Sequence, residues 1–153
     1  MAVTFLHPST CLIGVGGFFM KMYHEELKHM LELIHYQLFR GGRPLICGLI
    51  PPVEYKNLTV LDAMKKSLEM EKLITKLIED FIKMTEELED YQAADFLTTV
   101  FLNEQMKSIN EIAQHVTKMT LLKNCKDGVY HYDLKLAKRY PYCYIPKNLG
   151  NTA

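Results

Sequence analysis

Two side chains with metal-binding chemistry, Glu26 and His29, are placed by helical spacing on a largely apolar face. At 100° per residue, Glu26 falls within the apolar face of a helix predicted over residues 19–39, and His29 lies one turn later at its edge. The apolar members of this face are Phe19, Leu27, Met30, Leu33, Ile34 and Leu38. A carboxylate and an imidazole among such neighbours indicate a buried polar partner or a bound cation.

The next two predicted helices each carry a comparable polar residue. Glu71 lies on the apolar side of the helix predicted over residues 58–84. That side consists of Met64, Leu68, Ile74, Ile78 and Ile82. Gln105 lies in the apolar row of the helix predicted over residues 91–122. That row consists of Phe101, Leu102, Ile109, Ile112 and Val116. Three helices are therefore expected to direct oxygen or nitrogen ligands toward a shared core.

The absence of a basic residue from these faces favours a metal ion over an ion pair. An unpaired buried carboxylate costs several kcal/mol, so it normally has a cationic partner or a metal. The candidate ligands are Glu26, His29, Glu71 and Gln105. They offer oxygen and imidazole nitrogen without thiolate, which suits iron or manganese and fits structural zinc poorly. Glu-x-x-His on one helix, with carboxylates on facing helices, is typical of di-iron carboxylate bundles.

Each residue also has an interpretation without a metal. A single Glu-x-x-His on a helix is usually a pair of surface residues. His29 alone could be a hydrogen-bonded histidine at the edge of the core, and Gln105 alone a hydrogen-bonded core amide. The coincidence of such residues on three helices favours the metal site.

Length and charge exclude several classes of protein. The chain has 153 residues, enough for one domain with a sizeable core. Lys+Arg and Asp+Glu both number 18, so we expect no nucleic-acid partner and no polybasic attachment to a membrane. No apolar run approaches the roughly 20 residues that span a bilayer. The apolar start lacks a basic region and is interrupted at His7-Pro8, so we expect a cytoplasmic protein without a signal peptide.

The four cysteines are expected to be free thiols. They are Cys11, Cys47, Cys125 and Cys143, which are far apart and form no CxxC pair. This spacing indicates a reducing compartment, without a disulfide framework or a zinc site.

The pattern predicts an all-α protein. The long helices are expected at about residues 19–39, 58–84 and 91–122, with a possible short helix at 129–139. Gly41-Gly42 is a strong signal for a helix end, and Asn57 or Thr59 could cap the second helix. The proline-containing connection after the first helix, about 17 residues long, could let the next helix point the same way.

Three segments resemble helices of animal ferritins. "FFMKMYHEELKHMLELIHYQLFRGGRP" is similar to their second bundle helix, "LDAMKKSLEMEK" to the third and "LNEQMKSINEIAQHVTKM" to the fourth. The resemblance runs without a gap from about Phe18 to Met119. It implies a ferritin-like helical bundle over residues 18–140, with a long crossover loop and a degenerate short last helix, followed by an irregular tail at 141–153.

The resemblance implies roles for the candidate residues. The positions that correspond to the ferroxidase centre of heavy-type subunits are Glu26, His29, Glu71 and Gln105. Glu25 and Glu104 fall on auxiliary iron-path positions, and Asp95 on the three-fold iron pore. Such subunits oxidise Fe(II) with dioxygen and store ferric mineral in a shell of 24 subunits. Iron, dioxygen and other ferritin subunits are the partners expected from this family.

The N-terminal segment departs from the family pattern. Ferritin subunits have a long helix before the matching part, which supplies a further iron-ligating Glu and a nearby Tyr. One proline and three glycines predict an irregular apolar segment over residues 1–17 instead. They are Pro8, Gly14, Gly16 and Gly17. The site is then expected to lack those ligands, and a strip of core to face solvent.

Two further departures concern assembly. Asp95 is kept at the three-fold pore, but Thr98 replaces the acid expected one turn later. In the last segment, Asp133 and Lys135 are expected to disturb an apolar four-fold contact.

Three functions remain open from the sequence. The first is iron storage with ferroxidase activity at a di-iron centre. The second is a catalytically silent, structural or truncated ferritin-derived subunit. The third is a helical interaction module without a metal, whose exposed groove binds a partner helix.

Overall fold

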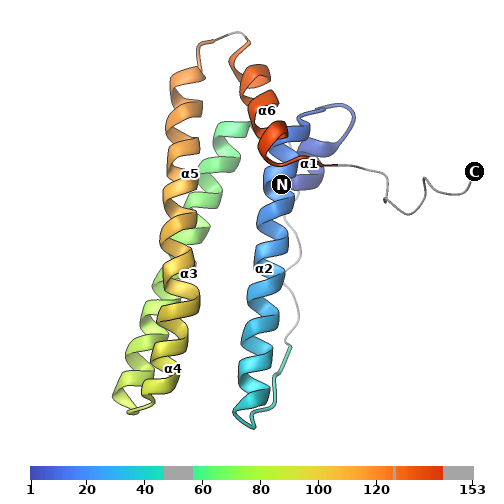
Figure 1. Cartoon of the computed structure of the whole chain (residues 1–153). Helices are drawn as coiled ribbons and strands as arrows, with labels where there is room; N and C mark the ends of the chain where they lie inside the picture. Colours follow the sequence, from blue (N-terminus) through green and yellow to red (C-terminus); the bar gives the residue numbers. More distant parts are fainter. Residues whose placement is uncertain (47–56, 126, 143–153) are drawn as a thin grey trace, which may run out of the picture. The chain divides into compact units, whose positions relative to one another are not determined.

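The computed structural model describes residues 1–46, 57–125 and 127–142. All regular structure in these ranges is helical, which confirms the predicted all-α class. The elements are α1 (Ala2–Leu6), α2 (Ile13–Phe39), α3 (Val60–Glu87), α4 (Tyr91–Phe96), the π-helical η1 (Leu97–Leu102), α5 (Asn103–Leu122) and α6 (Gly128–Arg139) (Figure 1). None of the helices in the described part is both long and apolar enough to cross a membrane.

The chain divides into two compact units, which are described separately. The first comprises Met1–Lys56 and Lys126–Ala153 and contains α1, α2 and α6. The second comprises Asn57–Cys125 and contains α3, α4, η1 and α5.

The N-terminal segment of the first unit differs from the sequence prediction. Residues 1–17 were expected to be irregular, but α1 forms within them and α2 begins at Ile13, six residues earlier than predicted. The glycines at the start of α2 permit close packing of helices. A Cβ atom at Gly14 would collide with the backbone of α6 at Asp133 and Ala137, and one at Gly17 with the carbonyl of Tyr140. The cost of glycine in a helix is therefore offset by the approach of α6.

A carboxylate of α6 caps the N-terminus of α2. The N-cap residue Leu12 provides no side-chain hydrogen bond. Instead, the buried Asp133 accepts a hydrogen bond from the backbone N–H of Val15 at 2.8 Å. This contact satisfies one of the N–H groups that a helix start leaves without an intrahelical partner. Asp133, expected from the family pattern to disturb an assembly contact, thus has a role within its own unit.

Aromatic side chains form the core around this junction. The Phe5 ring of α1 stacks on Phe19 with a centroid distance of 5.7 Å. Phe18 makes an edge contact with Tyr140 at 5.4 Å. Val15 and Phe18 are almost fully buried. Within this unit, α1 and α6 both pack against α2, whose buried residues all lie between Gly14 and Phe19 (Figure 1).

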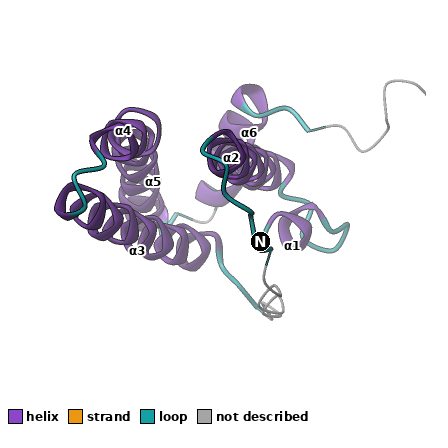
Figure 2. Ribbon diagram, turned by 90° about the horizontal axis from the view of Figure 1, so that it is seen from below, coloured by secondary structure: helices purple, strands orange, loops and turns teal. Residues whose placement is uncertain are grey.

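The second unit follows the predicted helices closely. α3 begins after Thr59, whose hydroxyl accepts a hydrogen bond from the N–H of Asp62 at 3.1 Å, so Thr59 is the cap. α3 ends at Glu87, three residues beyond the predicted end. The stretch predicted as one helix at 91–122 is helical throughout, although its middle adopts π geometry at η1. α3 and α5 lie side by side (Figures 1 and 2).

Other predictions concern the thiols and the tail. Cys11 and Cys125 are exposed free thiols, as expected. Cys47 and Cys143 lie outside the described residues, as does the tail from residue 143 onward.

Candidate functional site

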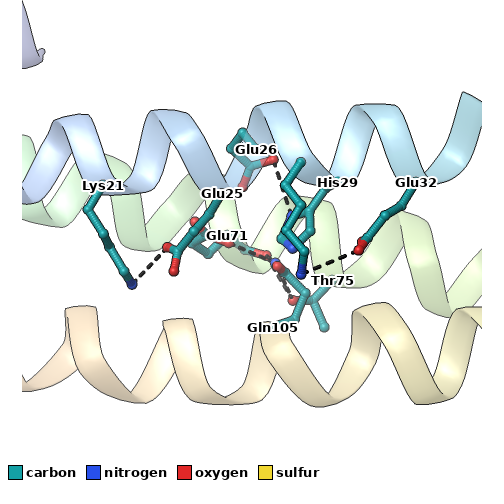
Figure 3. Close-up of polar contacts among 9 residues, drawn as sticks. Lys21, Glu25, Glu26, His29, Glu32, Glu71, Thr75 and Gln105 are labelled. Carbon is teal, nitrogen blue, oxygen red and sulfur yellow. Dashed lines mark hydrogen bonds and ion pairs between the residues drawn. The ribbon is translucent and has the colours of Figure 1, made fainter. Parts of the chain in front are cut away.

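Glu71 and Gln105, predicted from two separate helices, are in direct contact. The Gln105 Nε2 atom of α5 donates a hydrogen bond to Glu71 Oε2 of α3 at 2.7 Å (Figure 3). The same amide nitrogen lies 3.2 Å from the backbone oxygen of Glu71. Both residues are buried, with 5% and 3% of their surfaces exposed. The apolar faces of α3 and α5 bring them together because both faces turn toward the same interface.

Thr75 belongs to the same network and was missed from the sequence. Its hydroxyl donates to the backbone oxygen of Glu71 at 2.8 Å, and its oxygen accepts from Gln105 Nε2 at 3.4 Å (Figure 3). Thr75 follows Glu71 by four residues, the spacing at which helix residues share a face. A polar residue at that spacing on an apolar face was the available signal. Threonine in a helix commonly donates its hydroxyl to a backbone oxygen of the same helix, so its presence there does not by itself indicate a partner on another helix.

This network can present oxygen atoms to a cation after one rearrangement. The amide of Gln105 carries a donor on one side and an acceptor on the other. Its donor side faces the Glu71 carboxylate. A half turn of the amide would direct its oxygen toward the same region, where it would join the carboxylate as a second oxygen ligand. Carboxylate and amide oxygens suit hard cations such as iron or manganese.

Glu26 and His29 form a second pair on α2. The His29 Nδ1 atom lies 3.8 Å from Glu26 Oε2 (Figure 3). The imidazole is 13% exposed, whereas the carboxylate side chain is 49% exposed. Glu26 is therefore only half buried, although its position on the wheel predicted a place within an apolar face. Apolar neighbours on that face are also exposed, since Leu27 and Met30 retain 38% and 44% of their surface.

The four candidate ligands are thus described as two pairs, one in each unit. Glu26 with His29 belongs to the first unit, and Glu71 with Gln105 to the second. Within the described residues, no group of three or more His, Cys, Asp or Glu side chains is arranged to hold a metal ion. Joint binding of iron by the four residues stays a prediction.

The auxiliary residues have contacts of their own. Glu25 forms an ion pair with Lys21 at 2.7 Å along α2 (Figure 3). Asp95 is exposed on α4 and accepts a hydrogen bond from the Thr99 hydroxyl at 3.3 Å. Glu104 lies in the first turn of α5 and is partly buried. Their assignment to an iron path or a pore stays a prediction.

Comparison with known proteins agrees with the helical architecture. The ferritin-like domain family matches residues 1–122. The chain is 35% identical over 136 residues to "Ferritin-3, chloroplastic" of Vigna unguiculata, covering 86% of this chain and 53% of that protein. It is 35% identical over 132 residues to "Soma ferritin" of Lymnaea stagnalis, covering 86% and 74%. "Ferritin, middle subunit" of Salmo salar is 31% identical over 132 residues, covering 86% and 75%.

These matches define the class of the protein. The chain belongs to the ferritin family, as the resemblance of its helices predicted. It spans about half the length of the plant relatives and about three quarters of the two animal relatives.

Proposed function

We propose that this chain acts in iron storage, binding Fe(II) as a substrate at a site that includes Glu71 and Gln105. The observation that carries the proposal is the buried contact between a carboxylate and an amide on α3 and α5. Membership of the ferritin family supports iron as the cation. Glu26 and His29 would supply a second carboxylate and the imidazole, as the sequence resemblance implies.

The chemistry proposed for these groups is oxidation of Fe(II) by dioxygen. Two ferrous ions would each give up one electron, and dioxygen would accept both and two protons, reaching the level of hydrogen peroxide. The carboxylates of Glu26 and Glu71 would balance part of the positive charge, which increases when iron is oxidised. Gln105, a neutral and weak ligand, would let ferric iron leave toward a mineral.

A catalytically silent subunit is the second candidate. The half-exposed carboxylate of Glu26 favours it. Such a subunit could enter a ferritin shell with other subunits without oxidising iron itself. A cytoplasmic location, expected from the sequence, belongs to either proposal; the names of the plant relatives place those proteins in chloroplasts.

Fe(II) binding and oxygen uptake by the purified full chain separate the two proposals. We expect saturable anaerobic Fe(II) binding and iron-dependent oxygen consumption, both lost in Glu71→Ala. Glu69→Ala is the matched control, because Glu69 is an exposed carboxylate on the same helix. Oxygen uptake equal in the native chain and in Glu71→Ala would eliminate the ferroxidase proposal. Fe(II) binding without oxygen uptake would favour the silent subunit.

A further inference from the structure

Three oxygen atoms surround the amide nitrogen of Gln105. The Nε2 atom lies 2.7 Å from Glu71 Oε2, 3.2 Å from the backbone oxygen of Glu71 and 3.4 Å from Thr75 Oγ1 (Figure 3). All three residues belong to α3 or α5, so these contacts are made entirely within the second unit. An amide nitrogen carries two hydrogens, so one can point to the carboxylate and the other to the two remaining oxygens. The nitrogen side of the Gln105 amide is therefore held against α3.

The chemistry of these oxygens decides which end of the amide faces them. A backbone oxygen only accepts hydrogen bonds, and so does the oxygen of an ionised carboxylate. The Thr75 hydroxyl donates its hydrogen to the backbone oxygen of Glu71 at 2.8 Å, which leaves its lone pairs for Gln105. If the amide were turned over, the Gln105 oxygen would face three acceptors. That arrangement costs free energy unless a cation lies beside the oxygen.

Thr75 differs from the other two acceptors because it can be removed without removing a candidate iron ligand. The Glu71 carboxylate is itself a proposed ligand, and the backbone oxygen of Glu71 belongs to the helix. The Thr75 hydroxyl contacts the amide and the backbone oxygen together, and it acts on the site through the amide. Its effect on a bound cation would therefore be exerted through the orientation of Gln105.

Binding of a cation by the Gln105 oxygen requires a half turn of the amide. The half turn breaks the hydrogen bonds of Nε2, and the free energy of those bonds lowers the apparent affinity of the site for the cation. We propose that Thr75 is a positioning residue, which holds the Gln105 nitrogen toward Glu71 and thereby weakens Fe(II) binding, so that the site releases iron. The choice of iron rests on the proposed function, whereas the orientation of the amide in the cation-free chain does not.

Thr85 provides a matched comparison on the same helix. Its side chain is buried like that of Thr75, and its hydroxyl donates to the backbone oxygen of Ile82 at 2.7 Å. Thr85 is ten residues beyond Thr75, which places it about 15 Å further along α3. Replacement of either threonine by valine removes a hydroxyl that bonds back to the helix and keeps the branched shape of the side chain. Only the change at Thr75 removes a contact with Gln105.

The first test measures hydrogen exchange of the Gln105 side-chain amide by proton–nitrogen NMR of the full chain without metal. The Gln105 signals are identified by their absence from Gln105→Leu. At least one hydrogen should exchange about tenfold more slowly than those of the exposed Gln114, because hydrogen bonding protects it. Thr75→Val should accelerate exchange of one hydrogen by about three- to tenfold, and Thr75→Ser should match the native chain. Unchanged exchange in Thr75→Val would overturn the proposal.

The second test measures the dissociation constant of Fe(II) by anaerobic titration of the same chains. Thr75→Val should bind Fe(II) about three- to tenfold more tightly than the native chain, because one bond that opposes the half turn is already absent. Thr75→Ser and Thr85→Val should bind as the native chain does. A role of Thr75 in folding alone would change the urea denaturation of Thr75→Val without strengthening its binding of iron. Weaker binding in Thr75→Val would also overturn the proposal, since the hydroxyl would then support the oxygen-facing orientation.

The two measurements separate failure of this inference from failure of the proposed function. If the native chain and Thr75→Val bind Fe(II) equally, iron binding stands and the role assigned to Thr75 is wrong. If neither chain binds Fe(II), the proposed function is wrong, and the role of Thr75 in iron release is wrong with it.

Discussion

Gln105 is a neutral donor to the buried carboxylate of Glu71. A substitution at either residue is therefore expected to change the stability of the chain as well as its binding of iron. The Gln105 amide donates to Glu71 at 2.7 Å, and Thr75 adds a hydroxyl to the same network. A buried donor or acceptor that loses its partner costs more than the hydrogen bond contributes. Stability and iron binding therefore need separate measurements at these residues.

Removal of the Gln105 amide should destabilise the metal-free chain. Gln105→Leu removes the hydrogen bond from Gln105 Nε2 to the buried Glu71 carboxylate and should lower the free energy of unfolding by about 1–3 kcal/mol. Replacing both partners, as Glu71→Leu with Gln105→Leu, should recover part of this loss because no buried charge remains. Urea denaturation in the presence of a chelator measures both. If Gln105→Leu were as stable as the native chain, the hydrogen bond between Gln105 and Glu71 would contribute little to stability.

At the scale of the elements, the start of α2 depends on α6. The helix begins at glycines that α6 approaches closely, and its N–H group at Val15 is capped by Asp133. Glycine spacing alone predicted an irregular segment here. The start of α2 and α6 therefore form one junction, held by close backbone packing at Gly14 and by the hydrogen bond from Val15 to Asp133.

Gly14 and Gly16 should respond differently to an added methyl group. A Cβ atom at Gly14 meets the backbone of α6, which cannot move locally, whereas one at Gly16 meets the side chain of Leu6. Gly14→Ala should therefore destabilise the chain by more than about 1 kcal/mol beyond the effect of Gly16→Ala. Thermal unfolding of the two variants compares them directly. If Gly16→Ala were the more damaging change, packing of α1 would be the tighter contact.

Asp133 should make the stability of this junction depend on pH. Burial raises the pKa of the Asp133 carboxyl, and the hydrogen bonds from the N–H groups of Val15 and Gly14 lower it by less. The folded chain then takes up this proton more readily than the unfolded chain. The contribution of Asp133 to stability should rise as pH falls through the raised pKa and level off below the ordinary value for aspartate.

Asp133→Asn is the reference for this pH dependence, because its oxygen can still accept from Val15 but does not titrate. Denaturation from pH 7 to pH 3 should show the native chain gaining stability relative to the variant on acidification. A constant difference between the two chains over this range would mean that Asp133 titrates normally.

At the scale of the whole molecule, a substrate that binds only the folded state should raise its stability. Anaerobic Fe(II) at 100 times its dissociation constant should increase the free energy of unfolding by about 2.7 kcal/mol. The increase should be lost in Glu71→Ala and kept in Glu69→Ala, as measured by thermal unfolding with and without iron. Equal stabilisation of all three chains would indicate iron binding elsewhere.

Local periodicity in the sequence was enough to predict the all-α class, the long helices and the facing positions of Glu71 and Gln105. Helical spacing is a property of neighbouring residues, so a wheel assigns a face before any packing is known. The start of α2, the cap from Asp133 and the place of Thr75 in the polar network were decided only by tertiary structure. Val15 and Asp133 are 118 residues apart, and their contact depends on where α6 packs. Glycines that break an isolated helix can serve a packed one, because close approach of a second backbone offsets their conformational cost.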